Sequence, residues 1–138
     1  MDPILEETAV RILTDHRDDP KSLWTALEEN GLTRAWVSEA HGGYGLTPTN
    51  GFGLIRLAGA YAAPVPLAET LMAGWLLDVA GLRAPPGQMS VLIKGFQHGI
   101  AFGGSAEHIL CIEGRSVSLC PGPVADMLAA AGEDPLSD

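Results

Sequence analysis

A glycine-rich segment is the first stretch of the chain whose residue types suggest chemistry. The sequence SEAHGGYGLTPTN, residues 38–50, places three glycines within four positions, between two amphipathic segments. Such a loop can cradle phosphate with its backbone N–H groups, but the dinucleotide-binding pattern G-x-G-x-x-G requires a third glycine where Pro48 stands. We therefore expect these glycines to adopt positive φ angles in a tight connection between two helices.

A second segment, GGSAE at residues 103–107, matches a hydrolase nucleophile elbow at three positions. The fifth position of that motif is glycine, and Glu107 stands there. No Asp and His follow Ser105 in the order and at the distance that a catalytic triad of this type requires. We expect Ser105 to be an ordinary loop serine, and the sequence predicts no catalytic residue.

The histidines and cysteines do not have metal-ligand spacing. His98 and His108 are ten residues apart and are expected on different strands, and no helix carries an H-x-x-x-H pair. Cys111 lies inside an apolar run with no basic neighbour to lower the pKa of its thiol, so it is expected to behave as a small hydrophobic residue. The sequence thus predicts no metal site. The remaining residues of these types are His16, His41 and Cys120.

Glu69 is the carboxylate whose surroundings differ from those of the others. It lies near the start of a nearly all-apolar segment, where a buried carboxylate with a raised pKa would indicate a pocket. The alternative is an acidic residue in the first turn of a helix, stabilised by the helix dipole without any pocket. We favour the helix-dipole alternative, because it requires nothing else of the fold.

Four helices are expected to position these residues. Asp2 with Pro3, Asp19 with Pro20, and Thr47 with Pro48 each combine a capping side chain with proline at the first helical position. Gly31 is expected to end the second helix in the left-handed conformation, and Gly81 the fourth. The fourth segment, residues 66–81, is apolar almost all round, so we expect it to be buried on most sides.

Residues 83–88, RAPPGQ, look like an interdomain linker, and β-like runs follow them. These runs are residues 89–93, 99–102, 108–113 and 116–120, and the last two are separated by Gly114 and Arg115 as in a hairpin. Residues 123–132 suit one short helix. Four short strands bury too little apolar surface to form a stable core alone. They are therefore expected to lie on the helices or to belong to a larger sheet.

Composition excludes several classes of function. The 138 residues are 46% hydrophobic, only 18% charged, and carry a formal net charge of −9. The eight Lys and Arg residues are scattered, which argues against binding of nucleic acid or of an anionic membrane surface. No apolar run is long enough for a membrane span, and the first residues lack a signal-peptide pattern, so a cytoplasmic location is expected.

The order of these signals resembles the N-terminal helical domain of the acyl-CoA dehydrogenase family over residues 20–80. Family members show a helix end of the form L-W/F-x-x-L-x-E-x-G-L, a P-E-x-x-G-G-x-G-x-S/T loop, and a P-x-x-E-T-like helix start. The positions that match are Leu23, Trp24, Glu29, Gly31 and Leu32 in the first element, Glu39, Gly42, Gly43, Gly45 and Thr47 in the second, and Pro66, Glu69 and Thr70 in the third.

The resemblance implies a mainly α fold, with a helical bundle of acyl-CoA dehydrogenase type at residues 1–83. A short, incomplete antiparallel β segment with a C-terminal helical turn would follow at residues 84–138. In a complete enzyme, a carboxylate removes the α-proton of an acyl-CoA thioester and FAD accepts the β-hydride. By resemblance, Glu69, Met72 and Ala73 would line the acyl pocket.

The catalytic glutamate and the flavin-contacting motifs of the family have no counterpart in this chain. The expectation is therefore an acyl-CoA dehydrogenase-like flavoprotein module, an oxidoreductase by resemblance in fatty acid metabolism, which is not catalytic alone. The alternative is a non-catalytic subunit that docks on a partner carrying the flavin and the base. Acyl-CoA or a partner subunit, in a homo- or hetero-oligomer, is the expected binding partner.

Overall fold

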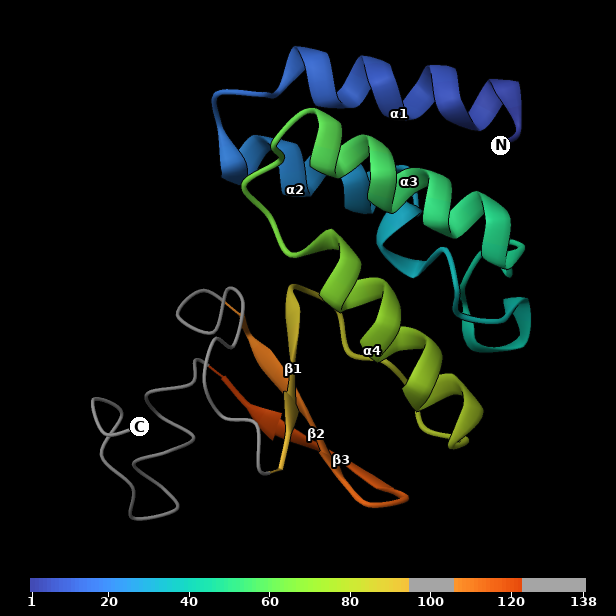
Figure 1. Ribbon diagram of the computed structural model, residues 1–138, viewed down its shortest axis with the longest axis vertical. Helices are drawn as coiled ribbons and strands as arrows, with labels where there is room; N and C mark the ends of the chain where they lie inside the picture. Colours follow the sequence, from blue (N-terminus) through green and yellow to red (C-terminus); the bar gives the residue numbers. More distant parts are fainter. Residues whose placement is uncertain (95–105, 123–138) are drawn as a thin grey trace.

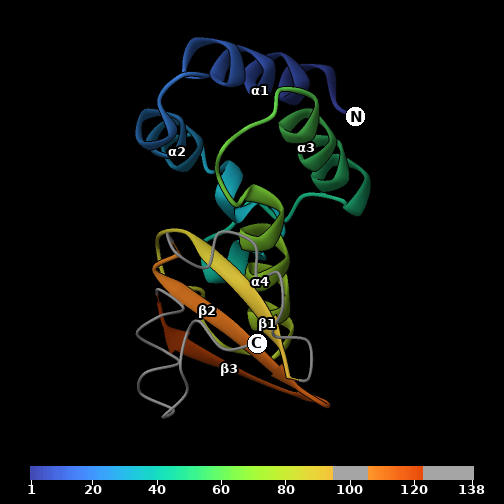
Figure 2. The same ribbon diagram turned by 60° about the vertical axis from the view of Figure 1, so that its left-hand side comes forward.

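The structure, a computed structural model, describes residues 1–94 and 106–122. Within these residues the chain forms α-helices, two short 3-10 helices (η) and one three-stranded sheet, so the fold is mixed α and β. The elements are α1 (Pro3–Asp15), α2 (Pro20–Glu29), η1 (Leu32–Arg34), η2 (Glu39–His41), α3 (Pro48–Ala60), α4 (Leu67–Val79), β1 (Met89–Ile93), β2 (His108–Glu113) and β3 (Ser116–Pro121). Helices α1, α2 and α3 lie together at one end of the molecule, the sheet lies at the other, and α4 runs between them (Figures 1 and 2).

The predicted helix starts are confirmed. The Asp19 carboxylate accepts hydrogen bonds from the backbone N–H groups of Lys21 and Ser22, at 3.1 and 3.2 Å, and Pro20 is the first helical residue. Asp2 caps α1 and Thr47 caps α3 in the same way. Each cap satisfies backbone donors that the first turn of a helix leaves without an internal partner, which is worth about 1 kcal/mol.

The first three helices enclose a core of their own together with η1 and the start of α4. Leu23 and Leu27 of α2, Leu54 of α3 and Leu71 of α4 are each only 1% exposed. Burying a leucine side chain contributes roughly 1.5–3 kcal/mol, so this cluster supplies the main hydrophobic stabilisation of the helical end.

The sheet has the order β1-β2-β3, and it differs from the expected antiparallel arrangement. β2 and β3 are antiparallel, as the tight turn at Gly114 and Arg115 requires, but β1 pairs with β2 in parallel, with Met89 opposite His108. A parallel pair needs a connection of about a dozen residues or more, and residues 94–107 are long enough to let the chain return in the same direction. The expected strand at 99–102, Ser105 and the expected helix at 123–132 lie outside the described residues.

Helix α4 joins the helical end to the sheet through one buried hydroxyl. Thr70 Oγ1 donates to the Met89 carbonyl at 3.2 Å and accepts from the Met89 N–H at 3.1 Å. Ala73 and Leu77 of α4 pack with Met89 and Leu110 in a second hydrophobic cluster beneath the sheet. The strands therefore lie on the helical part, the first of the two arrangements expected for so small a sheet.

The proline-rich segment at residues 83–88 is hydrogen-bonded to two elements of the helical part, η1 and α2. Arg34 Nη2 donates to the Ala84 carbonyl at 3.0 Å, and the Gly87 N–H donates to Glu28 Oε2 at 3.3 Å. These contacts reach back to η1 and α2, so this connection is anchored along its length.

Candidate functional site

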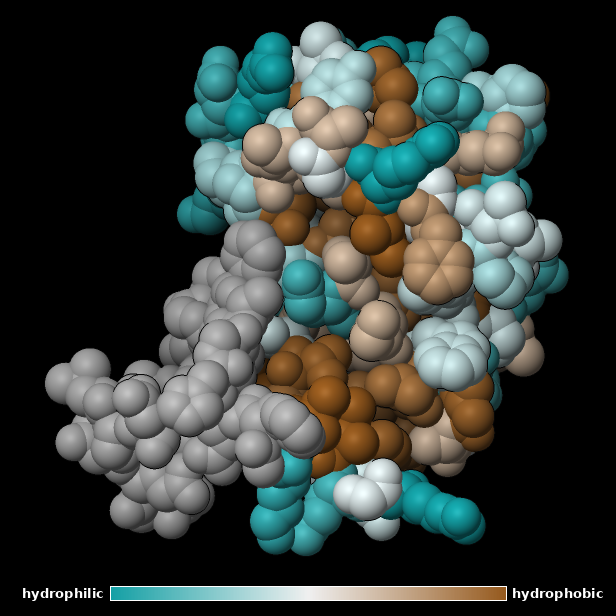
Figure 3. All heavy atoms as spheres, in the orientation of Figure 1, coloured by the Kyte–Doolittle hydropathy of each residue, from teal (hydrophilic) through white to brown (hydrophobic). Residues whose placement is uncertain are grey.

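The expectation that α4 is buried on most sides is wrong for one of its faces. A helix presents positions i, i+3 and i+7 on the same side, and in α4 these positions are Met72, Trp75 and Val79. Their side chains are 44%, 49% and 67% exposed. Hydrophobic residues gather over the part of the surface that α4 occupies (Figure 3). Leu67 and Leu71 face the helical core and Ala73 and Leu77 face the sheet. Among residues 1–94 and 106–122, α4 therefore has three apolar faces and two apolar neighbours.

The exposed face of α4 forms one wall of an open groove of about 600 Å³. The opposite wall comes from the chain between η1 and α3 and from the start of α3. The groove is lined by Trp36, Leu46, Pro48, Phe52, Met72, Trp75 and Leu76, with Ser38, Gly45 and Asp78 adding polar and backbone groups. We call this feature the α3–α4 groove.

Trp36 and Phe52 form an aromatic pair in the wall opposite α4. Their ring centroids are 4.9 Å apart with an interplanar angle of 70°, an edge-to-face arrangement. The indole lies directly against α3 at Gly51, where a Cβ atom would come within 2.6 Å of Trp36 Cζ2 and closer still to Nε1. Trp36 Nε1 also donates to the Thr47 carbonyl at 3.4 Å. Because Gly51 has no side chain, the tryptophan ring can lie in this position against α3.

The expectation of positive φ angles in the glycine-rich loop is confirmed for two of its three glycines. Gly42 and Gly45 have φ angles of 85° and 59°, whereas the φ angle of Gly43 is not positive. The N–H groups of Gly43, Tyr44 and Gly45 donate to the backbone carbonyls of Ser38, Arg34 and Val37, respectively, over 2.8–3.1 Å. Since these donors are engaged by backbone carbonyls of residues 34–38, they do not form a phosphate cradle.

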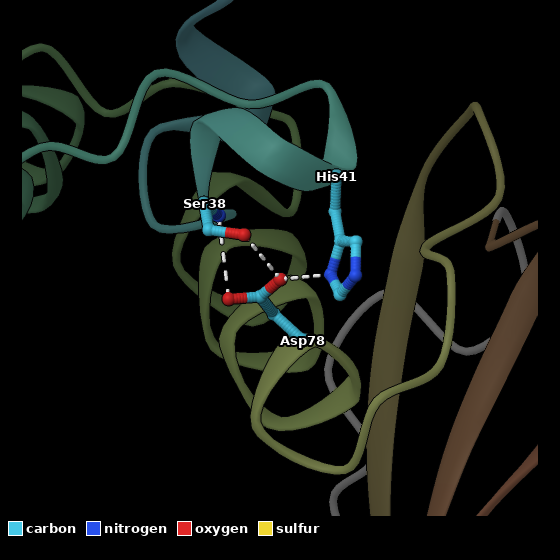
Figure 4. Close-up of polar contacts among 3 residues, drawn as sticks. All are labelled: Ser38, His41 and Asp78. Carbon is cyan, nitrogen blue, oxygen red and sulfur yellow. Dashed lines mark hydrogen bonds and ion pairs between the residues drawn. The ribbon is translucent and has the colours of Figure 1, made fainter.

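A polar cluster closes one side of the groove. Asp78, near the end of α4, accepts hydrogen bonds from Ser38 Oγ at 2.8 Å, from the Ser38 N–H at 3.3 Å and from His41 Nδ1 at 2.5 Å. Both side chains point at the Asp78 carboxylate (Figure 4). The hydrogen bond from Ser38 Oγ is the main cause that lowers the pKa of Asp78 below its ordinary value of 3.8; partial burial raises this pKa, and the bond from His41 lowers it again.

The geometry of this cluster does not activate a nucleophile. In a Ser-His-Asp triad the histidine accepts the serine proton, while the aspartate orients the histidine. Here the Ser38 hydroxyl donates to Asp78 instead, and His41 donates to the same carboxylate oxygen. The arrangement therefore fastens the loop that contains η2 to the end of α4, and its role is structural.

Comparisons with protein-family models, with curated proteins and with solved structures found no match. The family expectation thus continues to depend on the motif order in residues 20–80.

The three residues expected to line an acyl pocket do not lie together. Met72 lines the α3–α4 groove, whereas Ala73 is fully buried on the side of α4 that faces the sheet. Adjacent residues on a helix diverge by about 100°, and here that angle turns Met72 toward the groove and Ala73 toward the sheet. Glu69 is partly buried and does not line the groove, and its Oε2 atom is buried without a hydrogen-bond partner.

Sequence reasoning missed the aromatic residues of the groove. The apolar pattern of residues 66–81 does not single out Trp75, although its i+3 spacing from Met72 puts the two side chains on the same side of α4. Trp36 and Phe52 come from separate elements, and no local pattern joins them.

Within residues 1–94 and 106–122, no three His, Cys, Asp or Glu side chains are grouped so that they could hold a metal ion. His16 Nδ1 lies 2.6 Å from Ser22 Oγ, and His98 lies outside the described residues. In the same part of the chain, no helix is long and apolar enough to cross a bilayer.

Proposed function

We propose that this chain is a non-catalytic module of acyl-CoA dehydrogenase type that binds the acyl chain of an acyl-CoA thioester in the α3–α4 groove. The observation that carries the proposal is an open groove of about 600 Å³ with aromatic side chains on both walls and Met72 on the α4 wall. This volume lies within the range of about 300–1,000 Å³ that is typical of small-molecule sites. The resemblance of residues 20–80 to the family supplies the class of ligand.

The physical properties of the groove suit a flexible hydrocarbon chain. Phe52, Met72 and Trp75 are about half exposed, so a ligand can reach them without moving the core. Each methylene group transferred from water into such surroundings contributes roughly 0.8 kcal/mol. Between Met72 and Asp78, α4 offers a wall of about 9 Å at 1.5 Å per residue.

At the Asp78 end of the groove, charge favours the uncharged carbonyl of a thioester over the carboxylate of a free fatty acid. Asp78 is anionic near neutral pH, since its pKa is lowered, and it borders the groove. A ligand carboxylate beside it would be repelled, whereas the uncharged carbonyl of a thioester would not.

The described residues do not fit a flavin or the catalytic base of a dehydrogenase. The pyrophosphate of FAD needs free backbone donors or clustered cations, and the N–H groups of Gly43, Tyr44 and Gly45 already donate to backbone carbonyls of residues 34–38. All three hydrogen bonds of Asp78 fix it in a structural role, and Glu69 does not line the groove. We therefore assign no redox step to this chain and propose that flavin and base, where they are used, belong to a partner.

A binding titration tests the proposal. Tryptophan fluorescence is followed during addition of straight-chain acyl-CoA thioesters of increasing length, with coenzyme A alone as the control ligand. We expect Kd to fall about fourfold per methylene, the equivalent of 0.8 kcal/mol, until the groove is filled. An absorption spectrum of the purified protein between about 350 and 500 nm checks the flavin assignment.

Two matched variants locate the site. Met72→Asp introduces a charge into the groove, and Ile4→Asp introduces the same charge at a 74% exposed position on α1. Because both positions are exposed on helices, both proteins should fold. Met72→Asp is expected to abolish acyl-CoA binding and Ile4→Asp to preserve it. Affinity that does not depend on chain length, or equal effects of the two variants, would refute the proposal.

A second candidate function is docking on a partner subunit, and the extent of the exposed apolar surface favours it. Val79 and Leu82 are 67% and 46% exposed and continue this surface beyond the groove lining. A Val79→Glu variant separates the two functions. It should weaken association with a partner or a second copy, measured by sedimentation, while acyl-CoA binding in the groove remains.

A further inference from the structure

The two cysteines of the chain lie on paired strands. Cys111 is on β2 and Cys120 is on β3. In the antiparallel register Cys111 is opposite Ser118 and Cys120 is opposite Ile109, so the cysteines are diagonal neighbours. Positions two apart on a strand share a face, and both cysteines therefore project from the same side of the sheet.

That side is the one turned away from α4. Cys111 and Cys120 pack against the cluster formed by Leu92, Ala106 and Ile109, whereas Leu110 belongs to the cluster beneath the sheet. Both thiols are partly buried. The pair thus lies outside the α3–α4 groove and has no part in the function proposed for it.

The two sulfur atoms are close enough to form a bond after a small side-chain movement. Their Sγ atoms are 3.1 Å apart, and a disulfide bond is about 2.03–2.05 Å long. The full register between β2 and β3 keeps the strands in place, so a change of about 1 Å between the sulfur atoms is sufficient. This proximity comes from the fold of the hairpin and needs no other element to move.

We propose that Cys111 and Cys120 are a modification site at which a reversible intramolecular disulfide forms by exchange with a low-molecular-weight disulfide. In the first step the Cys120 thiolate attacks one sulfur of the small disulfide, forming a mixed disulfide and releasing one small thiolate. In the second step Cys111, having given its proton to solvent, attacks Cys120 Sγ and releases a second small thiolate. Both small thiolates take up protons, so the protein loses two electrons and two protons and the oxidant becomes two thiols.

The order of the two steps follows from the surroundings of Cys111. Burial, with a further contribution from the hydrogen bond to Cys120, raises the pKa of the Cys111 thiol to about 12. Because the thiolate is the attacking species, Cys111 is poorly suited to the first step. Once Cys120 carries the small thiol, its own contribution to the raised pKa of Cys111 is removed, and the attacked sulfur is already within reach.

Intact mass spectrometry of the full chain tests this inference, with glutathione disulfide as the oxidant and acid quenching before alkylation. We expect the wild-type protein to lose two hydrogens, about 2 Da, to lose both maleimide-reactive thiols, and to regain them with a reductant. Cys111→Ser should instead accumulate a single glutathione adduct on Cys120, because the resolving thiol is missing.

A matched control keeps two cysteines on the same two strands but separates them. The double variant Cys120→Ser with Val117→Cys moves the second thiol to the other face of the sheet, opposite Ile112. It should not form the intramolecular disulfide under the conditions that oxidise the wild type. The inference is overturned if wild-type thiols stay reactive, if the wild type accumulates two glutathione adducts, or if the control closes as fast as the wild type. Acyl-CoA titrations are read separately, so failure of the groove proposal leaves this test unaffected.

Discussion

Gly51 and Gly59 lie in the same helix, and replacing each by alanine should change the stability in opposite directions. An alanine methyl group at Gly59 meets no atom within 4 Å, so Gly59→Ala has only the gain in helix propensity, up to about 1 kcal/mol. The same methyl group at Gly51 would lie 2.6 Å from Trp36 Cζ2 and nearer to Nε1. The indole would have to retreat by roughly 1 Å or more to restore a carbon separation of about 3.5–4.0 Å.

The magnitude follows from what this movement disrupts. Overpacking of this kind typically costs about 1–3 kcal/mol, and loss of the edge-to-face contact with Phe52 is worth about 0.5–1.5 kcal/mol. Because both variants gain helix propensity, the difference between them isolates the steric cost. We expect Gly51→Ala to be less stable than Gly59→Ala by about 1–3 kcal/mol.

Urea denaturation followed by far-ultraviolet circular dichroism measures the two free energies of unfolding. Acyl-CoA titration of the folded variants supplies a second measurement, because displacement of Trp36 should weaken binding in Gly51→Ala and leave it unchanged in Gly59→Ala. Equal free energies of unfolding for the two variants would show that Gly51 does not place the tryptophan, and the account of the groove wall would fail with it.

Two further perturbations test how α4 is held. Thr70→Val should lower the free energy of unfolding by about 1–3 kcal/mol, because it leaves the buried Met89 N–H without its acceptor; Thr70→Ser, which keeps the hydroxyl, should lower it less, as urea denaturation can verify. The pKa of Asp78 is lowered in the folded protein, so its stabilising effect is present above pH 3.8 and is lost as the pH falls through the folded-state pKa. The wild type should therefore be more stable than Asp78→Asn at pH 5 and converge with it at lower pH; a constant difference across that range would contradict the hydrogen-bonding role given to Ser38 and His41.

Local signals in the sequence predicted the local structure. Asp19 followed by Pro20 predicted both the start of α2 and its cap, since all the atoms involved lie within one helical turn. Gly31 was predicted as the end of the same helix and has the left-handed φ angle of 70°. The pair Gly114 and Arg115 predicted the β2–β3 hairpin for the same reason.

Features that join distant residues were not predictable in the same way. The direction of β1 depends on the path of residues 94–107, which no turn motif specifies, so a parallel pair was expected to be antiparallel. Asp78 and Ser38 are 40 positions apart, and a carboxylate at the end of a helix shows no local sign of its partner. Burial of α4 was overestimated because apolar composition does not say whether each face has a neighbour.

The three apolar faces of α4 differ in which substitutions the fold tolerates. Ala73 is fully buried, and a Cβ atom at Gly74 would already be 3.0 Å from Val37 Cγ2, so both positions leave little room for larger residues. Met72, Trp75 and Val79 meet no such restriction from the fold itself. If homologous sequences keep large apolar residues at those three positions while ordinary surface positions diverge, selection must be preserving a contact that is made from outside the chain.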